Sequence, residues 1–290
     1  MEFNEKKAED AVPGQKRTDR CIETKVADRD VKIAGQYQVC RALGRGATSC
    51  VYLACDTIHG GQVAIKIISN PDGSVAKESE LIKRLFHPAL PKIRQVWQEA
   101  GLIYVVMDYV EGRSLMQWIE ESNGLICAAE NPGKHRLRLN RLNQCIDWGK
   151  QLCKVLIYLH SQTPPLIYRD LKPENIILQR DGRLKLVDFG TMMEKKRFWG
   201  NDCQGTRGYA APEQYRKYGR IDDRTDIYCL GKTLFHIWLG QLPGKGTHPE
   251  FWKLSQRERR FLKILMRCTR RTKCLRFHSL KEVLSALEQL

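Results

Sequence analysis

The sequence predicts an α+β protein with two lobes, a small antiparallel β-sheet lobe with one helix followed by a larger, mainly helical lobe. Apolar residues alternate with period two over residues 37–68, which is typical of strands with one buried face. The second half of the chain instead shows long apolar patterns of helical period. We expect a ligand to bind in the cleft between two such lobes.

The first lobe is expected to contain five strands and one helix. Residues 49–56 alternate in SCVYLACD, and VAIKII at 63–68 follows the turn signal His59-Gly60-Gly61, which predicts three antiparallel strands from residue 37 onward. A helical pattern over residues 77–86 ends at His87-Pro88, because the residue before a proline disfavours helix. Two further strands are expected around residues 93–98 and 102–107.

The second lobe is expected to be helical over roughly residues 142–161, 225–239, 256–268 and 279–289. Residues 131–141, NPGKHRLRLNR, are expected to form a loop between two helices, with four Lys/Arg and one His on it. We place the two lobes at residues 34–109 and 110–290.

Residues 1–32 contain eight acidic and eight basic residues and a single aromatic residue, Phe3. Such a segment cannot bury enough apolar surface to offset the entropy lost on ordering. We therefore expect residues 1–33 to form a flexible charged arm. Because residues 1–32 have no net charge, the formal +16 of the chain belongs to the folded part.

The composition excludes several classes of protein. Hydrophobic residues make up 42% and charged residues 28%, as in a soluble globular chain. The longest apolar run, 102–107, is far below the roughly 20 residues of a membrane span, and the first ten residues are not a secretory signal. The eleven cysteines show no CxxC pair or Cys/His cluster, which favours reduced cysteines, no structural zinc and a cytoplasmic location.

A glycine-rich segment, LGRGATSCV at 43–51, joins the first two strands. Gly44 and Gly46 allow a tight turn that brings backbone N–H groups close to phosphate oxygens. Ser49 stands where the usual G-x-G-x-x-G pattern has its third glycine, and most glycine-rich hairpins are only hairpins. Alone, the segment is a weak indication of phosphate binding.

Lys66 lies in the middle of the apolar strand VAIKII, where an unpaired ammonium group would be costly to bury. It could be a lysine that reaches solvent at a strand edge. Alternatively, it could point to phosphates while a carboxylate holds it. Glu78 shares a helical face with Leu81, Ile82 and Leu85, so we take Glu78 as the partner of Lys66.

Two polar segments in the second lobe complete the pattern. YRDLKPEN at 168–175 precedes the apolar run 176–178, and Asp188-Phe189-Gly190 ends the strand pattern 184–187. With Lys66, Glu78 and the glycine-rich turn, these motifs resemble the eukaryotic-like (Hanks-type) serine/threonine protein kinases of bacteria. The resemblance covers roughly residues 37–290 and implies a bilobed protein kinase-like fold.

The resemblance implies ATP and Mg²⁺ as cofactors and serine or threonine side chains of proteins as substrates, with autophosphorylation. Asp170 would accept the hydroxyl proton, Lys172 would reach the γ-phosphate, and Thr206 would bridge the two. Asn175 and Asp188 would supply the oxygen ligands that Mg²⁺ prefers.

The resemblance also implies the nucleotide contacts. Met107 would be the gatekeeper at the back of the adenine pocket, and Asp108 and Val110 would offer backbone groups of the hinge. The remaining nucleotide-binding residues would be Leu43, Gly44, Arg45, Gly46, Ala47, Thr48, Ser49, Cys50, Val51, Ala64, Lys66 and Ile177.

Structural roles follow in the same way. Glu213 of Ala211-Pro212-Glu213 would form a buried ion pair with Arg276, and Asp226 would cap the catalytic loop from the next helix. Tyr168 stands where the family usually has histidine, a residue that packs and hydrogen-bonds without doing chemistry.

The loop 191–204 contains no Ser, Thr or Tyr after Thr191, although Arg169 would normally meet a phosphorylated residue of this loop. We hypothesise that Asp202 or Glu194 takes the place of the phosphate, so that the kinase needs no loop phosphorylation.

The segment 255–276 contains nine Lys/Arg and one Glu. A solvated helical face is the simplest interpretation, and the alternative is a docking patch for an acidic partner, an anionic membrane surface or nucleic acid. Nucleic acid is a minor possibility, because no aromatic-rich motif accompanies the segment. Two alternative functions are a pseudokinase that acts as a scaffold and a small-molecule kinase. The complete set of charged motifs argues against the first, and the Ala211-Pro212-Glu213 segment argues against the second.

Overall fold

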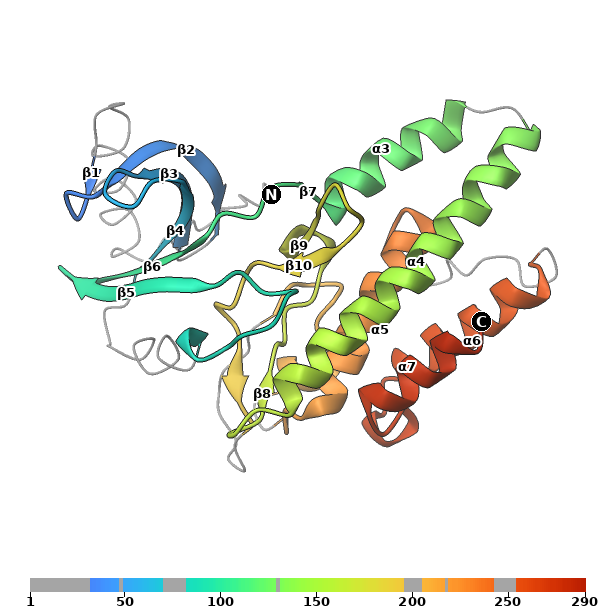
Figure 1. The fold of residues 1–290 in the computed structure, drawn as a ribbon. Coiled ribbons are helices and arrows are strands. Elements are labelled where there is room, and N and C mark those ends of the chain that lie inside the picture. Colours follow the sequence, from blue (N-terminus) through green and yellow to red (C-terminus); the bar gives the residue numbers. More distant parts are fainter. Residues whose placement is uncertain are drawn as a thin grey trace, which may run out of the picture. The chain divides into compact units, whose positions relative to one another are not determined.

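The computed structural model describes residues 32–46, 49–69, 82–128, 131–195, 205–216, 219–242 and 254–290 (Figure 1). The chain divides into two compact units. The first comprises the described residues up to Arg84 together with Lys92–Tyr109, and the second comprises Leu85–Pro91 and Val110–Leu290.

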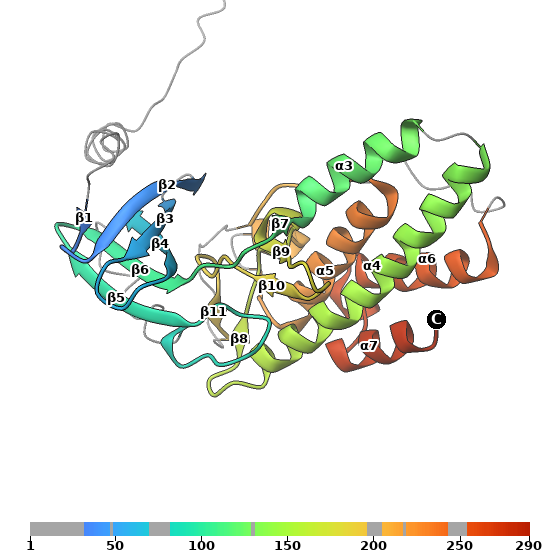
Figure 2. The same cartoon turned by 45° about the horizontal axis from the view of Figure 1, so that its top comes forward.

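The first unit is built on one six-stranded antiparallel sheet with strand order β1-β2-β3-β4-β6-β5 (Figure 2). The five strands predicted after residue 36 are confirmed, and β1 is an additional short edge strand. The strands are β1 (Lys32–Ile33), β2 (Tyr37–Arg45), β3 (Ser49–Asp56), β4 (Gln62–Ser69), β5 (Ile93–Glu99) and β6 (Leu102–Asp108).

One face of this sheet carries the hydrophobic core of the first unit. Tyr52 of β3 lies opposite Ile65 of β4, and Ile65 lies opposite Val106 of β6, so the three side chains share a face. All three are at most 5% exposed. Trp97 and Tyr104 stack beside this cluster, with ring centroids 4.8 Å apart. The period-two alternation of the sequence therefore fixes which residues point into the core.

The predicted helix over residues 77–86 falls mainly outside the described residues. Ile82 and Lys83 are helical in the structure. The remainder of that prediction is not tested.

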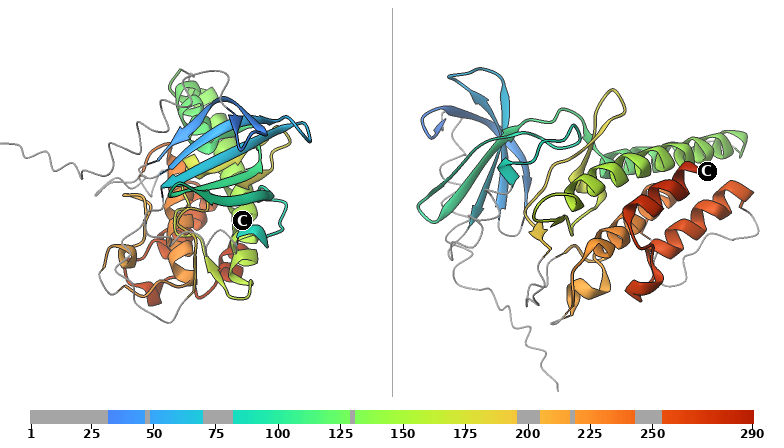
Figure 3. Two further views of the ribbon diagram at one scale, coloured as in Figure 1. Left: turned by 90° about the vertical axis from the view of Figure 1, so that its left-hand side faces the viewer. Right: turned by 60° about the horizontal axis from the view of Figure 1, so that its bottom comes forward.

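The second unit is mainly helical, as predicted (Figure 3). The long helix α4 packs against α5 and α7, and α5 packs against α6. The helices are α3 (Leu115–Ala128), α4 (Asn131–His160), α5 (Asp223–Leu239), α6 (Gln256–Cys268) and α7 (Leu280–Glu288).

The expected loop at residues 131–141 is wrong, because these residues form the first three turns of α4. Pro132 is the second residue of the helix, and a proline in the first turn costs no hydrogen bond. The end of the segment is fixed by tertiary contacts. Arg141 is 5% exposed and donates hydrogen bonds to Asn123 Oδ1 (2.9 Å) and to the carbonyl of Ile119 (3.2 Å) on α3.

Short elements connect the helices of this unit. A three-stranded sheet has the order β10-β9-β7, and a two-stranded sheet pairs β11 with β8. These elements are β7 (Arg113–Ser114), β8 (Leu166–Ile167), η1 (Pro173–Asn175), β9 (Ile176–Leu178), β10 (Leu184–Leu186), β11 (Met193–Glu194), η2 (Pro212–Tyr215) and η4 (Lys273–Leu275).

Candidate active site

The hairpin β9–β10 brings Asn175 and Asp188 to the same end of a small sheet. Ile176 lies opposite Leu186 in the antiparallel register, so the residue before β9 neighbours the residues after β10. The N–H of Val187 donates to the carbonyl of Asn175 at 3.1 Å. The two residues predicted to hold a metal are therefore held together by main-chain pairing.

The Asn175 side chain is oriented by its neighbours. Its Nδ2 donates to the carbonyl of Asp170 (3.0 Å) and to Asp170 Oδ2 (3.1 Å). Because the amide nitrogen is fixed in this way, the amide oxygen points away from Asp170, and no described residue donates to it. Asn175 is 7% exposed as a residue, and its amide oxygen is left available to a cation.

The Asp170 carboxylate lies at the centre of a hydrogen-bond network. Oδ1 accepts from the Thr206 N–H (3.1 Å) and from Thr206 Oγ1 (2.6 Å). Oδ2 accepts from Lys172 Nζ at 2.9 Å and from the Asn175 amide. Lys172 Nζ also donates to Thr206 Oγ1 at 2.6 Å. The predicted bridge by Thr206 between Asp170 and Lys172 is thus present.

Helix α5 holds the segment 168–175, which was predicted to be the catalytic loop, in place through Asp226, as predicted. Asp226 is fully buried, and its carboxylate accepts the N–H groups of Tyr168 (2.9 Å) and Arg169 (2.8 Å). His160 Nε2 lies 2.8 Å from the same carboxylate. Arg169 has φ +70°, a conformation that costs free energy in a non-glycine residue unless its surroundings fix it. These bonds supply that constraint.

Further along α5, Thr233 supports the same loop. Its Oγ1 donates to the carbonyl of Leu171 at 2.8 Å. The helix therefore contacts the loop on both sides of Asp170.

Tyr168 packs as predicted, since it is fully buried. The prediction that it also hydrogen-bonds is not met by its hydroxyl group, which has no hydrogen-bond partner among the described residues. Burial raises the pKa of the Tyr168 hydroxyl well above its ordinary value, and the nearby carboxylates of Asp188 and Asp170 raise this pKa further. The group therefore stays neutral.

Glu213 and Arg276 form the predicted buried ion pair. Arg276 Nη1 lies 2.7 Å from Glu213 Oε1, and Nη2 lies 2.9 Å from Oε2, a bidentate geometry. Arg276 is 1% exposed, and Thr225 of α5 donates to Glu213 at 3.0 Å. The pair ties the segment after Thr206 to the end of the chain.

The contacts of Arg169 do not test the hypothesis that Asp202 or Glu194 takes the place of a loop phosphate. Its Nε donates to the carbonyl of Thr191. Glu194 lies in β11, where it is paired with Leu166 of β8. Asp202 lies outside the described residues, so replacement of a loop phosphate by an acidic side chain stays a prediction.

A contact that the sequence did not indicate fixes the segment after Thr206. The Tyr209 hydroxyl lies 2.5 Å from His236 Nδ1 on α5, and both residues are at most 7% exposed. Burial lowers the pKa of His236 to about 4, and the positive charges of Arg141 and Lys232 lower it as well. A neutral His236 is therefore the partner of Tyr209. A histidine within the apolar pattern of 225–239 was the available signal.

In the first unit, the predicted nucleotide-binding residues gather on the face of the sheet opposite its core. Val51 lies opposite Lys66, and Ala64 lies opposite Met107. Ala64 and Lys66 are two residues apart on β4 and point to the same face. Gly44 of β2 lies opposite Val51 of β3, so this face extends onto β2.

Other residues of the predicted set differ in position. The side chain of Cys50 belongs to the hydrophobic core, so only its backbone remains for a nucleotide. The N–H of Asp108 donates to the carbonyl of Lys92 at 2.9 Å, so this N–H is not available to a ligand. Leu43, Arg45, Gly46 and Ser49 lie at the facing ends of β2 and β3, whereas Ala47 and Thr48 lie outside the described residues.

Lys66 is 7% exposed, as expected for a lysine in the middle of a strand. Glu78 lies outside the described residues, so the predicted pair of Glu78 with Lys66 is not tested. Val110 and Ile177 belong to the second unit, where Ile177 of β9 lies opposite Ser114 of β7.

Comparison with known protein families shows the family to which the chain belongs. A family model described as the protein kinase domain matches residues 37–288. The chain belongs to the protein kinase family. Protein kinases use ATP with a divalent metal ion. The fold is the protein kinase fold, with an antiparallel sheet and a helical region.

Relatives of this kinase domain are serine/threonine kinases from distant organisms. Serine/threonine-protein kinase PrkC of Bacillus subtilis is 31% identical over 228 residues, which are 74% of this chain and 32% of PrkC. Serine/threonine-protein kinase cds1 of Schizosaccharomyces pombe is 30% identical over 226 residues, which are 71% of this chain and 45% of cds1. The chain thus spans less than half the length of either protein.

A solved structure is similar over nearly the whole kinase domain. The crystal structure of the Mycobacterium tuberculosis PknI kinase domain has a TM-score of 0.65 and 25% sequence identity. The similarity covers 90% of this chain and 98% of the PknI chain. None of the described helices combines the length and the apolar character that crossing a membrane requires.

Proposed function

We propose that this chain is an ATP-dependent protein kinase that transfers the γ-phosphoryl group to serine and threonine hydroxyls of proteins, itself included. The observation that supports this best is the Asp170 network, in which the carboxylate, Lys172 Nζ and Thr206 Oγ1 lie within 2.6–2.9 Å of one another. A carboxylate beside a fixed ammonium group suits a hydroxyl that attacks a phosphoryl group.

In the proposed reaction, the acceptor oxygen bonds to the γ-phosphorus while the bond from that phosphorus to the ADP oxygen breaks. The hydroxyl proton passes to the Asp170 carboxylate, and Lys172 balances negative charge on the transferred group. Asp170 already accepts four hydrogen bonds, about as many as a carboxylate has lone-pair sites. The acceptor hydroxyl must therefore displace one of these donors as it binds.

The described residues fit a Mg²⁺ site. The available oxygen of Asn175 and the carboxylate of Asp188 form an oxygen donor set, and Mg²⁺ is usually held by one or two such groups together with phosphates. When bound, the ion would neutralise charge on the ATP phosphates. In the proposal, Lys66 with Glu78 positions the phosphates and residues 44–50 cover them. The residues that contact the adenine are Leu43, Val51, Ala64, Met107, Asp108, Val110 and Ile177.

The test is the intact mass of the purified chain before and after incubation with Mg-ATP, alongside an Asp170→Asn variant and dephosphorylated casein as acceptor. We expect phosphoryl additions on the wild-type chain and phosphoserine or phosphothreonine on casein, with at least about a hundredfold slower transfer by the variant. ATP binding without any transfer would favour the pseudokinase alternative. Phosphotyrosine alone would contradict the proposed residue preference.

Lys32 and Ile33, which were expected in the N-terminal arm, form β1 and pair with Gln38 and Tyr37 of β2, so we propose residues 32–290 as the kinase domain. The nine cysteines among the described residues are free, and five of them are buried, which favours a reducing compartment such as the cytoplasm.

The basic segment 255–276 is proposed as a contact for an acidic partner, with a smaller surface than the sequence indicated. Arg276 is used in the buried pair, Lys273 lies 3.0 Å from Asp222, and Arg257 donates to Asn143 at 2.6 Å. Retention on heparin that falls with salt, and falls further in an Arg260→Glu variant, would support the contact.

A further inference from the structure

Two thiols of the first unit lie in contact on neighbouring strands. The Sγ atoms of Cys40 on β2 and Cys55 on β3 are 3.4 Å apart. The two strands pair in antiparallel fashion and lie side by side in the six-stranded sheet (Figure 2). The proposed kinase reaction uses neither sulfur, so this contact has to be explained separately.

An irregularity in the strand pairing brings the two sulfurs together. Cys55 lies opposite Gln38, and the register shifts between Val39 and Arg41 of β2. Cys40 is the residue between them, so it stands at a bulge, where a strand bends and can aim a side chain out of the regular alternation. Its side chain reaches diagonally across to Cys55.

The pair lies on the face of the sheet that is turned away from the hydrophobic core. Val39 and Ala54, which precede the two cysteines in sequence, both belong to the core. Because side chains alternate along a strand, Cys55 shares the opposite face with Val51, four residues earlier on β3. The contact with Cys55 places the Cys40 sulfur on that face as well.

Both sulfurs can be reached from solvent, since Cys40 is exposed and Cys55 is partly exposed. Partial burial and the neighbouring Cys55 sulfur raise the pKa of the Cys40 thiol. A protonated Cys40 can donate its S–H to the Cys55 sulfur or to the carbonyl of Gln38, which is 3.6 Å away. We therefore take Cys55 as the sulfur that loses its proton and reacts first.

The other described cysteines lack one or the other of these features. Burial raises the pKa of Cys268 to about 12, and it also raises the pKa of Cys145 and Cys153. Such thiols stay protonated and are shielded from solvent, so they are unreactive. Cys127 and Cys274 are exposed, but neither has a second sulfur within hydrogen-bond range among the described residues.

We propose that Cys40 and Cys55 form a thiol oxidation site, which a hydroperoxide converts to a disulfide that joins β2 to β3. The sulfurs have only a short distance to close, because a disulfide holds its two sulfur atoms about 2 Å apart. The proposal does not depend on the kinase reaction.

The oxidation proceeds in two steps. The Cys55 thiolate attacks the outer oxygen of the hydroperoxide, the O–O bond breaks, and Cys55 becomes a sulfenic acid. The other oxygen leaves as water or an alcohol after it takes up the proton that Cys55 released. The Cys40 thiolate then attacks the Cys55 sulfur, the S–O bond breaks, and the departing hydroxide takes up the Cys40 proton to form water. The two thiols together lose two electrons, and the peroxide gains them.

The disulfide would close residues 40–55 into a loop that contains the whole glycine-rich segment 43–51. In a reducing compartment such a bond is transient, and it is typical of sites that respond to oxidants. Oxidation would thus act on the hairpin that carries this segment.

The test treats the reduced full chain with a small excess of hydrogen peroxide, blocks the remaining thiols with iodoacetamide, and maps the bridged peptides by mass spectrometry without reduction. We expect a peptide pair that joins residue 40 to residue 55 and that separates on treatment with dithiothreitol. Fragment ions distinguish Cys55 from Cys50, which lies in the same region of β3 and faces the core. The absence of a bridge, or a bridge through Cys50, would overturn the proposal.

A comparison within the wild-type protein tests reactivity without any substitution. Cys274 is the internal reference, because it is exposed and has no neighbouring thiol among the described residues. We expect the Cys40–Cys55 disulfide to form at least about tenfold faster than Cys274 is oxidised. Equal rates would refute a site that is specialised for oxidation.

Variants test the order of the two steps. Cys40→Ser should stop at the sulfenic acid of Cys55, which dimedone labels, and should form no disulfide. Cys274→Ser is the matched control and should form the disulfide at the wild-type rate. Dimedone labelling of Cys40→Ser no stronger at Cys55 than at Cys274 would contradict the assignment of Cys55. Phosphoryl transfer plays no part in these measurements, so their outcome is independent of the proposed function.

Discussion

The buried contact between His236 and Tyr209 predicts how the stability of this protein depends on pH. The pKa of His236 is lowered from 6.5 to about 4 because the ring is buried, with further contributions from Arg141 and Lys232. In the unfolded chain the same histidine titrates near its ordinary pKa. The stabilisation from a neutral His236 is therefore complete above pH 6.5 and is lost as the pH falls from there toward pH 4.

The magnitude follows from the two pKa values. At pH 5.5 the unfolded histidine is mostly protonated while the folded one is neutral, which costs about 1.4 kcal/mol of unfolding free energy relative to pH 8. Below pH 4 the loss approaches about 3.4 kcal/mol. The variant His236→Gln keeps an acceptor for the Tyr209 hydroxyl and removes the titration.

The assay is urea denaturation at pH 8.0, 6.5 and 5.5, followed by tryptophan fluorescence. We expect the fall in stability between pH 8.0 and pH 5.5 to be about 1.4 kcal/mol smaller in His236→Gln than in the wild type. His278→Gln, which removes an exposed histidine, is the matched control and should keep the wild-type slope. Equal slopes in all three proteins would refute a neutral, buried His236.

Three further predictions concern the second unit. Glu213→Gln removes one half of a buried ion pair, so we expect a loss of about 3–5 kcal/mol in unfolding free energy by urea denaturation; a loss below about 1 kcal/mol would contradict the pair as described. Gly112→Ala should lower stability by about 2 kcal/mol or more, since its Cβ would lie 2.4 Å from the Leu178 carbonyl at φ +150°. Gly124→Ala, where nothing lies within 4 Å, should instead leave stability unchanged or higher, so equal thermal shifts in the two variants would count against this reasoning. Thr206→Val should lower kcat about a hundredfold with an unchanged melting temperature, and Thr206→Ser should restore it; a fully active Val variant would exclude a positioning role.

The alternation of apolar residues was sufficient to predict the strands of the first unit. It also assigned their faces, because side chains alternate with period two and cross-strand partners share a face. Lys66 and Ala64 are therefore on the side opposite Ile65 and Val63. Cys50 shows the limit of motif matching: its place in a glycine-rich segment indicated a nucleotide contact, whereas its position in β3 turns its side chain into the core.

The residues proposed for catalysis and metal binding were named from motifs that occur in a fixed order along the chain, and their catalytic roles stay predictions. Asn175 directly precedes β9, and Asp188 follows the end of β10 by two residues, so the pairing of the hairpin is enough to bring them together. The predicted pairs of Glu213 with Arg276 and of Asp226 with the catalytic loop came from the family resemblance. No local pattern could have supplied them.

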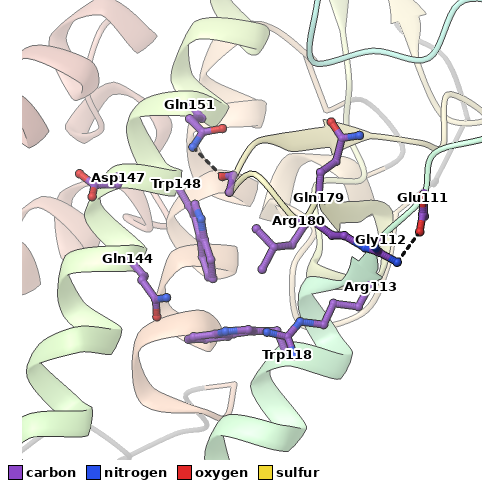
Figure 4. A pocket seen from close by; sticks show the side chains of 12 residues that line it. Glu111, Gly112, Arg113, Trp118, Gln144, Asp147, Trp148, Gln151, Gln179 and Arg180 are labelled. Carbon is purple, nitrogen blue, oxygen red and sulfur yellow. Dashed lines mark hydrogen bonds and ion pairs between the residues drawn. The ribbon is translucent and has the colours of Figure 1, made fainter.

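What could not be predicted depends on contacts between distant residues. Residues 131–141 form the first turns of α4, and the last of them, Arg141, donates hydrogen bonds to residues of α3. Nothing within residues 131–141 indicates these hydrogen bonds. Trp118 of α3 and Trp148 of α4 meet edge to face across two helices (Figure 4). From hydropathy alone, both tryptophans would be expected to be ordinary core residues.

Helix α5 contributes both to the stability of this kinase domain and to the positions of the residues proposed for its reaction. Within four turns it supplies Asp226 to the catalytic loop, Thr233 to the carbonyl of Leu171, and His236 to Tyr209 beyond Thr206. A helix of this length moves as a rigid rod, so none of these supports shifts alone. Substitutions that loosen α5 will therefore lower activity and stability together.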